Sequence, residues 1–196
     1  IIETTVPEKA IEATTISYNF SWVYKLLFVL YLFGASLLAG QFLMQLFNFF
    51  RMVYQSPKIK QNGYCYVLVD RPHYATTFLH YVLMSKNIWE SEDQSMIRSH
   101  ECFHVAYRHS FDRLLTELLC VFQWFNPFIY WFRKDLIAVH EYQVDQAMLD
   151  KGVDAIAYQQ LIAKYASLSS PFHFGNHFSH SLTLNRIKMI AQNKSY

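Results

Sequence analysis

Residues 26–50, LLFVLYLFGASLLAGQFLMQLFNFF, form a run of 25 positions without a formal charge. A helix rises about 1.5 Å per residue, so a helix of this length crosses the ~30 Å hydrocarbon core of a bilayer with room for tilt. The alternative is a helix buried in a large soluble core, but uncharged runs this long are rare outside membranes. We therefore expect a transmembrane helix over residues 22–50.

The charges that flank this run predict its orientation. Residues 1–24 carry three glutamates and one lysine, whereas Arg51, Lys58 and Lys60 follow the run closely. The positive-inside rule then places residues 51–196 in the cytoplasm and residues 1–21 in an external loop.

Because the chain begins with Ile rather than Met and has no cleavable signal pattern, we expect a fragment of a longer protein. Small residues over 34–40 would let another transmembrane helix pack closely.

The composition excludes several classes of protein. Of the 196 residues, 53% are hydrophobic, 18% are aromatic and 16% are charged, whereas about 25% are charged in a typical soluble domain. Such a composition excludes a disordered or linker-type chain. A net charge of +2 is too balanced to indicate a nucleic-acid binder. Three cysteines favour free thiols in a reducing compartment over a disulfide scaffold.

Beyond residue 56 the pattern predicts an α+β domain that is mostly α, with a small β-sheet. An Asn-Gly pair between β-prone residues predicts a hairpin over residues 58–69, and residues 76–84 are also β-prone. The spacing of a capping box at residues 91–94 predicts the start of a helix. The predicted helices cover residues 91–109, 112–125, 127–150, 154–168 and 182–192.

A second uncharged run covers the 15 residues 118–132 and is interrupted by Gln123, Asn126 and Pro127. This length is short for a membrane span and is more typical of a core helix or an interfacial segment. Core packing is the first interpretation, contact with the membrane surface the second and a true span the third.

His100-Glu101-Cys102-Phe103-His104 is an HExxH motif inside a predicted helix. Residues at i and i+4 share one helix face, so both imidazoles can reach one metal ion while Glu101 lies beside it. On its own, the motif could also be two surface histidines on an amphipathic helix.

A second pair of residues strengthens this metal-site hypothesis. Glu141 and Asp145 again have i and i+4 spacing, 37 residues beyond His104. Glu141 would complete a His₂Glu set with water in the fourth position, as in a catalytic zinc site. Asp145 could accept the N–H of a ligating imidazole, most readily that of His100, and fix its tautomer. The alternative is a solvated acidic helix face.

The sequence also resembles a known family. The segments HECFH (100–104), WFNP (124–127), HEYQVD (140–145) and SLTLNRIKMI (181–190), together with Asp112, are similar to BlaR/MecR-type antirepressor metalloproteases. The resemblance implies a gluzincin-like zinc endopeptidase domain in a multi-pass protein of the bacterial inner membrane, coupled to transmembrane signalling. It implies Zn²⁺ as cofactor. The implied partners are a protein substrate (a transcriptional repressor or the chain itself), the lipid bilayer and other transmembrane helices. Residues 76–84 resemble the sheet edge to which an extended substrate of gluzincins adds.

These observations predict a role for each candidate residue. His100, His104 and Glu141 would bind zinc, and Glu101 would take a proton from the attacking water and pass it to the leaving amine. Asp112 would either orient the second imidazole or cap the helix that begins there, and Cys102 would be a packing residue. The donor to the tetrahedral oxyanion stays open among His140, Tyr142, His173, His177 and His180.

Two other functions stay open. One is a transmembrane receptor or scaffold with a structural metal site, in which Glu101 would have no role. The other is a housekeeping membrane metalloprotease of the CAAX-processing or heat-shock type, which shares the same metal-binding pattern.

Overall fold

The computed structural model describes residues 21–72, 74–168 and 177–193, and the side chains of these ranges except 177–180 and 193. The predicted external loop lies outside the described residues, apart from Ser21. The described chain is mostly helical with one small mixed sheet, in agreement with the predicted fold class.

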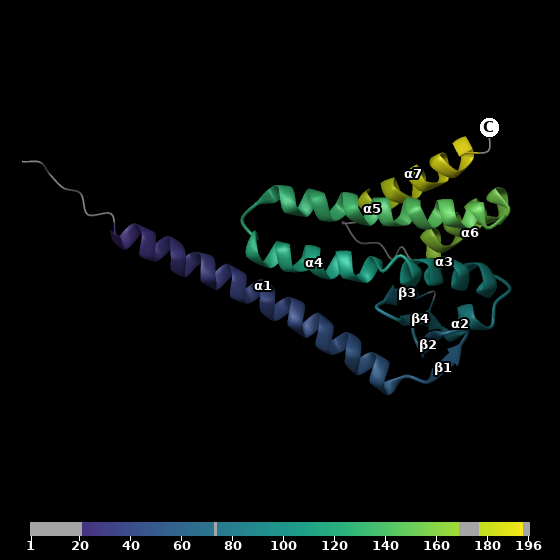
Figure 1. The fold of residues 1–196 in the computed structure, drawn as a ribbon, viewed down its shortest axis with the longest axis horizontal. Helices are drawn as coiled ribbons and strands as arrows, with labels where there is room; N and C mark the ends of the chain where they lie inside the picture. The colour runs from purple at the N-terminus through teal and green to yellow at the C-terminus, as the bar shows by residue number, and fades with distance from the viewer. Residues whose placement is uncertain (1–20, 73, 169–176, 194–196) are drawn as a thin grey trace, which may run out of the picture.

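The first element, α1 (Ser21–Gln55), is a 35-residue helix whose most apolar window has a mean hydropathy of 2.0 and is not buried inside the structure. By length and composition α1 could cross a membrane, and it is the one helix of that kind among the described residues. Figure 1 shows α1 as a long rod that extends well beyond the sheet. The helix continues past the predicted span, and this extra part contacts the sheet.

The four strands are β1 (Lys58–Gln61), β2 (Tyr64–Val69), β3 (Ala75–Phe78) and β4 (Tyr81–Ser85), in the order β1-β2-β4-β3. The predicted hairpin is confirmed, since Asn62 and Gly63 turn the chain with φ of 51° and 80°, as a type I′ turn requires. The β-prone stretch 76–84 is two strands rather than one, because Leu79 has a φ of 53° and reverses the chain. As a result, β3 is an edge strand, whereas β4 lies inside the sheet and pairs in parallel with β2.

The two faces of the sheet belong to two different cores, because successive side chains of a strand point to opposite faces. Tyr66, Val82 and Met84 pack with residues of the helices that form the larger core. Val67 and Leu83 face the other way and pack against the end of α1.

The remaining helices are α2 (Lys86–Trp89), α3 (Gln94–Ala106), α4 (His109–Phe122), α5 (Pro127–Asp150), α6 (Ala155–Leu168) and α7 (His177–Asn193). The predicted capping box is wrong. The Ser91 hydroxyl donates to the Ile88 carbonyl, and the helix begins later, after Asp93, which makes no side-chain capping bond. The predicted start of α5 is confirmed, since the Asn126 side chain accepts from the Phe128 N–H and Pro127 occupies the first turn.

The second uncharged run forms the end of an antiparallel pair of helices, and we call residues 118–132 the α4–α5 tip. Figure 1 shows this tip pointing away from the sheet, alongside α1. Core packing, the first interpretation of this run, is wrong for most of it. Although Cys120 and Ile129 are buried, four large side chains of the tip are between 60% and 67% exposed, namely Phe122, Phe125, Phe128 and Trp131.

Candidate metal centre

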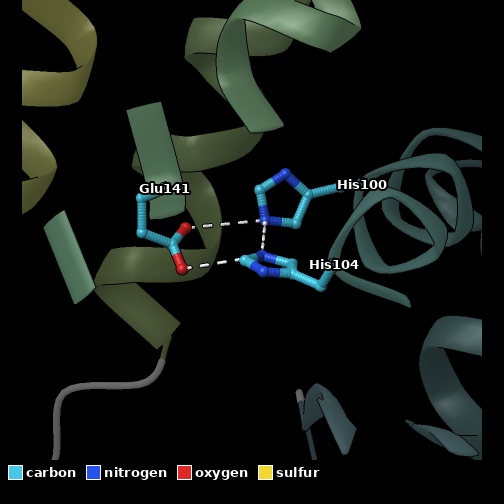
Figure 2. A group of neighbouring side chains, drawn as sticks. All are labelled: His100, His104 and Glu141. Carbon is cyan, nitrogen blue, oxygen red and sulfur yellow. Dashed lines mark hydrogen bonds and ion pairs between the residues drawn. The ribbon is translucent and has the colours of Figure 1, made fainter. Parts of the chain in front are cut away.

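Three predicted ligands from two helices converge on one point. His100 and His104 lie one turn apart on α3, and Glu141 faces them from α5 (Figure 2). The Nε2 atoms of the two imidazoles are 3.3 Å apart. One carboxylate oxygen of Glu141 lies 3.6 Å from the Nε2 of His100, and the other lies 3.6 Å from the Nε2 of His104. All three residues are partly buried.

These distances fit one tetrahedral metal ion. Nitrogen and oxygen ligands held 2.0–2.2 Å from zinc at tetrahedral angles lie about 3.3–3.6 Å from one another. The donor set of two imidazoles and one carboxylate is also the set of a zinc site that keeps one coordination position open.

The ring of His100 is held by a hydrogen-bonded chain that ends at Asp145. The Tyr158 hydroxyl donates to Asp145 Oδ1 at 2.7 Å, so its oxygen can accept from His100 Nδ1–H, also at 2.7 Å. This arrangement leaves Nε2 of His100 free for a metal. The predicted bond between Asp145 and His100 is therefore not direct, since Tyr158 of α6 lies between them.

The ring of His104 is held by a residue that sequence reasoning did not identify. His104 Nδ1 lies 2.9 Å from His109 Nδ1, and His109 Nε2 lies 3.1 Å from the Gln143 side-chain oxygen. These partners assign a donating Nδ1–H to His104 and a donating Nε2–H to His109. The contact exists because α3 ends before the predicted residue 109. Arg108 adopts a left-handed φ of 56° there and turns His109 back toward the motif.

Neither role predicted for Asp112 is found. Asp112 lies in the first turn of α4, which begins three residues earlier, and its carboxylate is 3.2 Å from His140 Nε2 rather than near His104. The His140 ring is buried and stacks on His109 with 3.9 Å between ring centroids. Asp112 is thus linked to His104 indirectly, through the stacked rings of His140 and His109.

Arg186 of α7 joins the carboxylates of the site. Its Nε and one Nη donate to the two oxygens of Asp145 at 2.8 and 2.7 Å, and the other Nη lies 2.8 Å from Glu141. Asp145 is fully buried and Arg186 nearly so. Arg186 belongs to the segment SLTLNRIKMI, which was noted for its family resemblance. The spacing of this segment from the other motifs did not predict the contact of Arg186 with the two carboxylates.

Glu101 lies beside the ligands on the buried side of α3. The hydroxyl of Thr77, on the edge strand β3, lies 2.7 Å from one Glu101 carboxylate oxygen and 3.0 Å from the Glu101 backbone carbonyl, and can donate to either. Burial raises the pKa of the Glu101 carboxyl above its ordinary value. A carboxylate of this kind accepts a proton more readily than an exposed one.

The protonation states of His104 and Glu141 are those that bind a cation. Burial, followed by the neighbouring His100, lowers the pKa of His104 to about 3, so the imidazole is neutral at pH 7. Burial alone would raise the pKa of Glu141, but the hydrogen bond to His100 and the charge of Arg186 outweigh it and lower that pKa. A neutral imidazole and an ionised carboxylate are the forms that bind a metal.

A cavity of about 230 Å³ opens beside His100 and Glu101. Its wall includes Ile97, Leu161 and Ile162, so it can receive an apolar side chain next to the metal centre.

Two predictions remain, the packing role of Cys102 and the candidates for the oxyanion donor. Cys102 is partly buried with its sulfur 3.3 Å from the Tyr66 hydroxyl, and burial raises its thiol pKa, which fits the predicted packing role. Among the candidates for an oxyanion donor, His140 is buried under His109, and Tyr142 is half-buried. The other three candidates, His173, His177 and His180, lie outside the described side chains.

The sequence was compared with models of known protein families and with curated proteins, and neither comparison found a match.

Proposed function

We propose that this chain is a membrane-anchored zinc-dependent endopeptidase of the BlaR/MecR type, with a regulatory role in transmembrane signalling. The observation that carries the proposal is that the two imidazole nitrogens and the Glu141 carboxylate approach one another to 3.3–3.6 Å, each imidazole facing a different carboxylate oxygen, with a buried glutamate beside them. In a purely structural site Glu101 would have no role, because structural zinc is usually held by four protein ligands.

A zinc ion held by His100, His104 and Glu141 would supply an acidified water and polarise the scissile carbonyl. Glu101 then accepts the proton of the attacking water and transfers it to the leaving amine. The Thr77 hydroxyl holds the Glu101 carboxylate in place, and burial raises the pKa of Glu101, which makes it a better proton acceptor. The chain's own contribution is thus to position one base and to keep the ligand rings in the correct tautomer.

An extended substrate would bind along the free edge of β3. This strand carries Thr77 and packs against α3, so a peptide paired with it runs past Glu101 and the metal ligands. Backbone pairing places few demands on sequence. The cavity beside Glu101 adds a preference for an apolar side chain. Protein substrates, either a repressor or the chain itself, fit this mode of binding.

Glu101→Gln tests the proposal, with Glu117→Gln as the matched control, because Glu117 of α4 makes only a half-exposed ion pair with Arg133 of α5. We expect Glu101→Gln to retain one zinc per chain and to lose cleavage of a fluorescent casein by about 100-fold or more. Glu117→Gln should retain both properties. Zinc binding with equal cleavage in both variants would contradict the proposal, and zinc binding without cleavage by the wild type would indicate a structural site.

A further inference from the structure

The α4–α5 tip is hydrogen-bonded to Tyr31, in the N-terminal half of α1. The indole N–H of Trp124 donates to the backbone carbonyl of Tyr31 at 3.2 Å, and the Tyr31 hydroxyl donates to the Phe122 carbonyl at 3.1 Å. The Tyr31 and Phe125 rings meet edge to face at 6.2 Å. A Cβ at Gly34 would overlap the Trp124 ring, so this glycine provides the space for the indole.

This contact fixes the depth of the tip in any membrane that α1 crosses. The hydrocarbon core accommodates about 20 residues of helix. Wherever such a window is placed within residues 22–50, it contains residues 31–34. The contacts of the tip with Tyr31 and Gly34 therefore lie within the hydrocarbon core or at its boundary.

The surface of the tip suits that position. The 15 residues 118–132 are uncharged, and the ion pair of Glu117 with Arg133, 3.2 Å, closes the hairpin at the point where the uncharged run begins and ends. Within the run, the four most exposed aromatic side chains are between 60% and 67% exposed, namely Phe122, Phe125, Phe128 and Trp131. In water, such an aromatic surface would be costly.

Several polar groups of the turn are paired within the protein, which lowers the cost of placing them in hydrocarbon. The Asn126 side chain accepts from the Phe128 N–H and donates to the Gln123 side chain. The Tyr130 hydroxyl donates to the Trp124 carbonyl, and the indole N–H is bonded to α1. Irregular backbone is tolerated at membrane depth only where protein satisfies its hydrogen bonds.

We propose that the α4–α5 tip is inserted in the lipid bilayer beside α1, with acyl chains covering its aromatic surface. The proposal rests on α1 crossing the bilayer and is independent of any metal or activity. It also determines where the metal centre lies. α4 begins at His109, which contacts His104, so the centre is held about 20 Å from the tip, the length of this 14-residue helix.

Two cysteine variants of the full chain test the proposal after reconstitution into phosphatidylcholine vesicles. Phe128→Cys puts a thiol on the tip, and Ile156→Cys puts one on α6, a position 51% exposed at the other end of the molecule. Each is labelled with an environment-sensitive fluorophore and quenched by nitroxide lipids or by aqueous iodide. The unsubstituted chain, whose cysteines are buried or half-buried, is the labelling blank.

We expect the label at residue 128 to lose roughly half of its fluorescence to nitroxide lipids and little to iodide, because it lies among acyl chains. The label at residue 156 should show the reverse. Iodide quenching at residue 128 equal to that at residue 156 would overturn the proposal by placing the tip in water. Protection from both quenchers would overturn it by indicating a protein cover, such as a second copy of the chain.

Discussion

Two buried chains of side chains hold the imidazoles of the metal centre, and each depends on one residue. Tyr158 lies between His100 and Asp145, and His109 lies between His104 and Gln143. Because Asp145 is also paired with Arg186, its carboxylate is held in place, and the Tyr158 hydroxyl connects it to the His100 ring. Burial and the Asp145 carboxylate raise the pKa of Tyr158, which keeps the hydroxyl protonated.

Tyr158→Phe should therefore weaken zinc binding without unfolding the chain. The ring of the phenylalanine fills the same space, but His100 Nδ1–H loses its acceptor, and loss of such a partner typically costs 10–100-fold in metal affinity. Competition with a chromophoric chelator measures the change. Tyr165→Phe, on the same helix, is the control and should bind zinc like the wild type. Equal affinities in the two variants would mean that Tyr158 does not orient the ligand.

The neutral state of His104 makes the stability of the metal-free chain depend on pH. Its pKa of about 3 in the folded protein lies below the ordinary value of 6.5. Protons therefore bind preferentially to the unfolded chain, and the folded state loses stability as pH falls from about 6.5 toward about 3. Above about pH 6.5, the titration of His104 no longer changes the stability of the folded chain.

We expect wild type to lose about 1.4 kcal/mol per pH unit relative to His104→Asn over that range. Unfolding in detergent with chelator present, measured at a series of pH values, gives the two curves. The variant also changes the titration of Glu141, because the His104 ring lies 3.6 Å from that carboxylate and lowers its pKa. Parallel curves would show that His104 can be protonated in the folded state.

At the residue level, the helical spacing of the motifs was enough to predict that His100, His104 and Glu141 lie together. His100 and His104 share a face because helix geometry requires it, and Glu141 followed from the same spacing on a second helix. Tyr158, His109 and Arg186 could not be predicted in their roles, because each reaches the centre through tertiary packing. Asp112 was misassigned for the same reason.

Among the elements, α7 connects the C-terminal part of the described chain to the metal centre through one side chain. Arg186 forms ion pairs with two carboxylates, of which Asp145 is fully buried. Asp145, held on both oxygens, keeps the pKa of Arg186 raised even though burial acts in the opposite direction. The attachment of α7 is therefore electrostatic as well as apolar.

Arg186→Gln should destabilise the chain by about 3–5 kcal/mol, the usual cost of leaving a buried charge without its partner. Thermal unfolding in detergent measures the loss. Lys164→Gln removes an exposed ion pair with Asp93 and should leave the unfolding temperature nearly unchanged. Added zinc should restore part of the stability of Arg186→Gln, because a bound cation compensates Glu141 but not Asp145. A small loss in both variants would contradict the role of Arg186.

The elements themselves could be predicted where the signal is local. The Asn62-Gly63 turn and the Asn126-Pro127 helix start are examples, since both depend on backbone preferences of adjacent residues. The end of α3 could not be predicted, because Arg108 adopts a left-handed conformation that only the packing of His109 explains. The split of residues 76–84 into β3 and β4 likewise depends on Leu79 in a conformation that leucine rarely adopts.

On the scale of the whole molecule, the apolar helix and the metal centre belong to one packed unit. The run of 25 uncharged residues predicted α1, but nothing in its sequence predicted that its end would cover the sheet. Val53 is buried there against the strands, and the Phe49 ring meets Phe78 of β3 at 4.7 Å. β3 in turn carries Thr77, which bonds Glu101. A continuous set of contacts thus leads from α1 to the proposed base.

Phe49→Ala tests whether this connection matters. Loss of the ring removes an aromatic pair and leaves a void beside β3, which should cost about 1–3 kcal/mol and should loosen the hold of Thr77 on Glu101. We expect peptidase activity to fall several-fold while zinc content is unchanged. Phe47→Ala is the matched control on the same helix, since Phe47 is 66% exposed. Equal activity in the two variants would show that the packing of α1 against β3 does not affect catalysis. A selective loss in Phe49→Ala would mean that a movement of α1 in the membrane can reach the base through β3 alone.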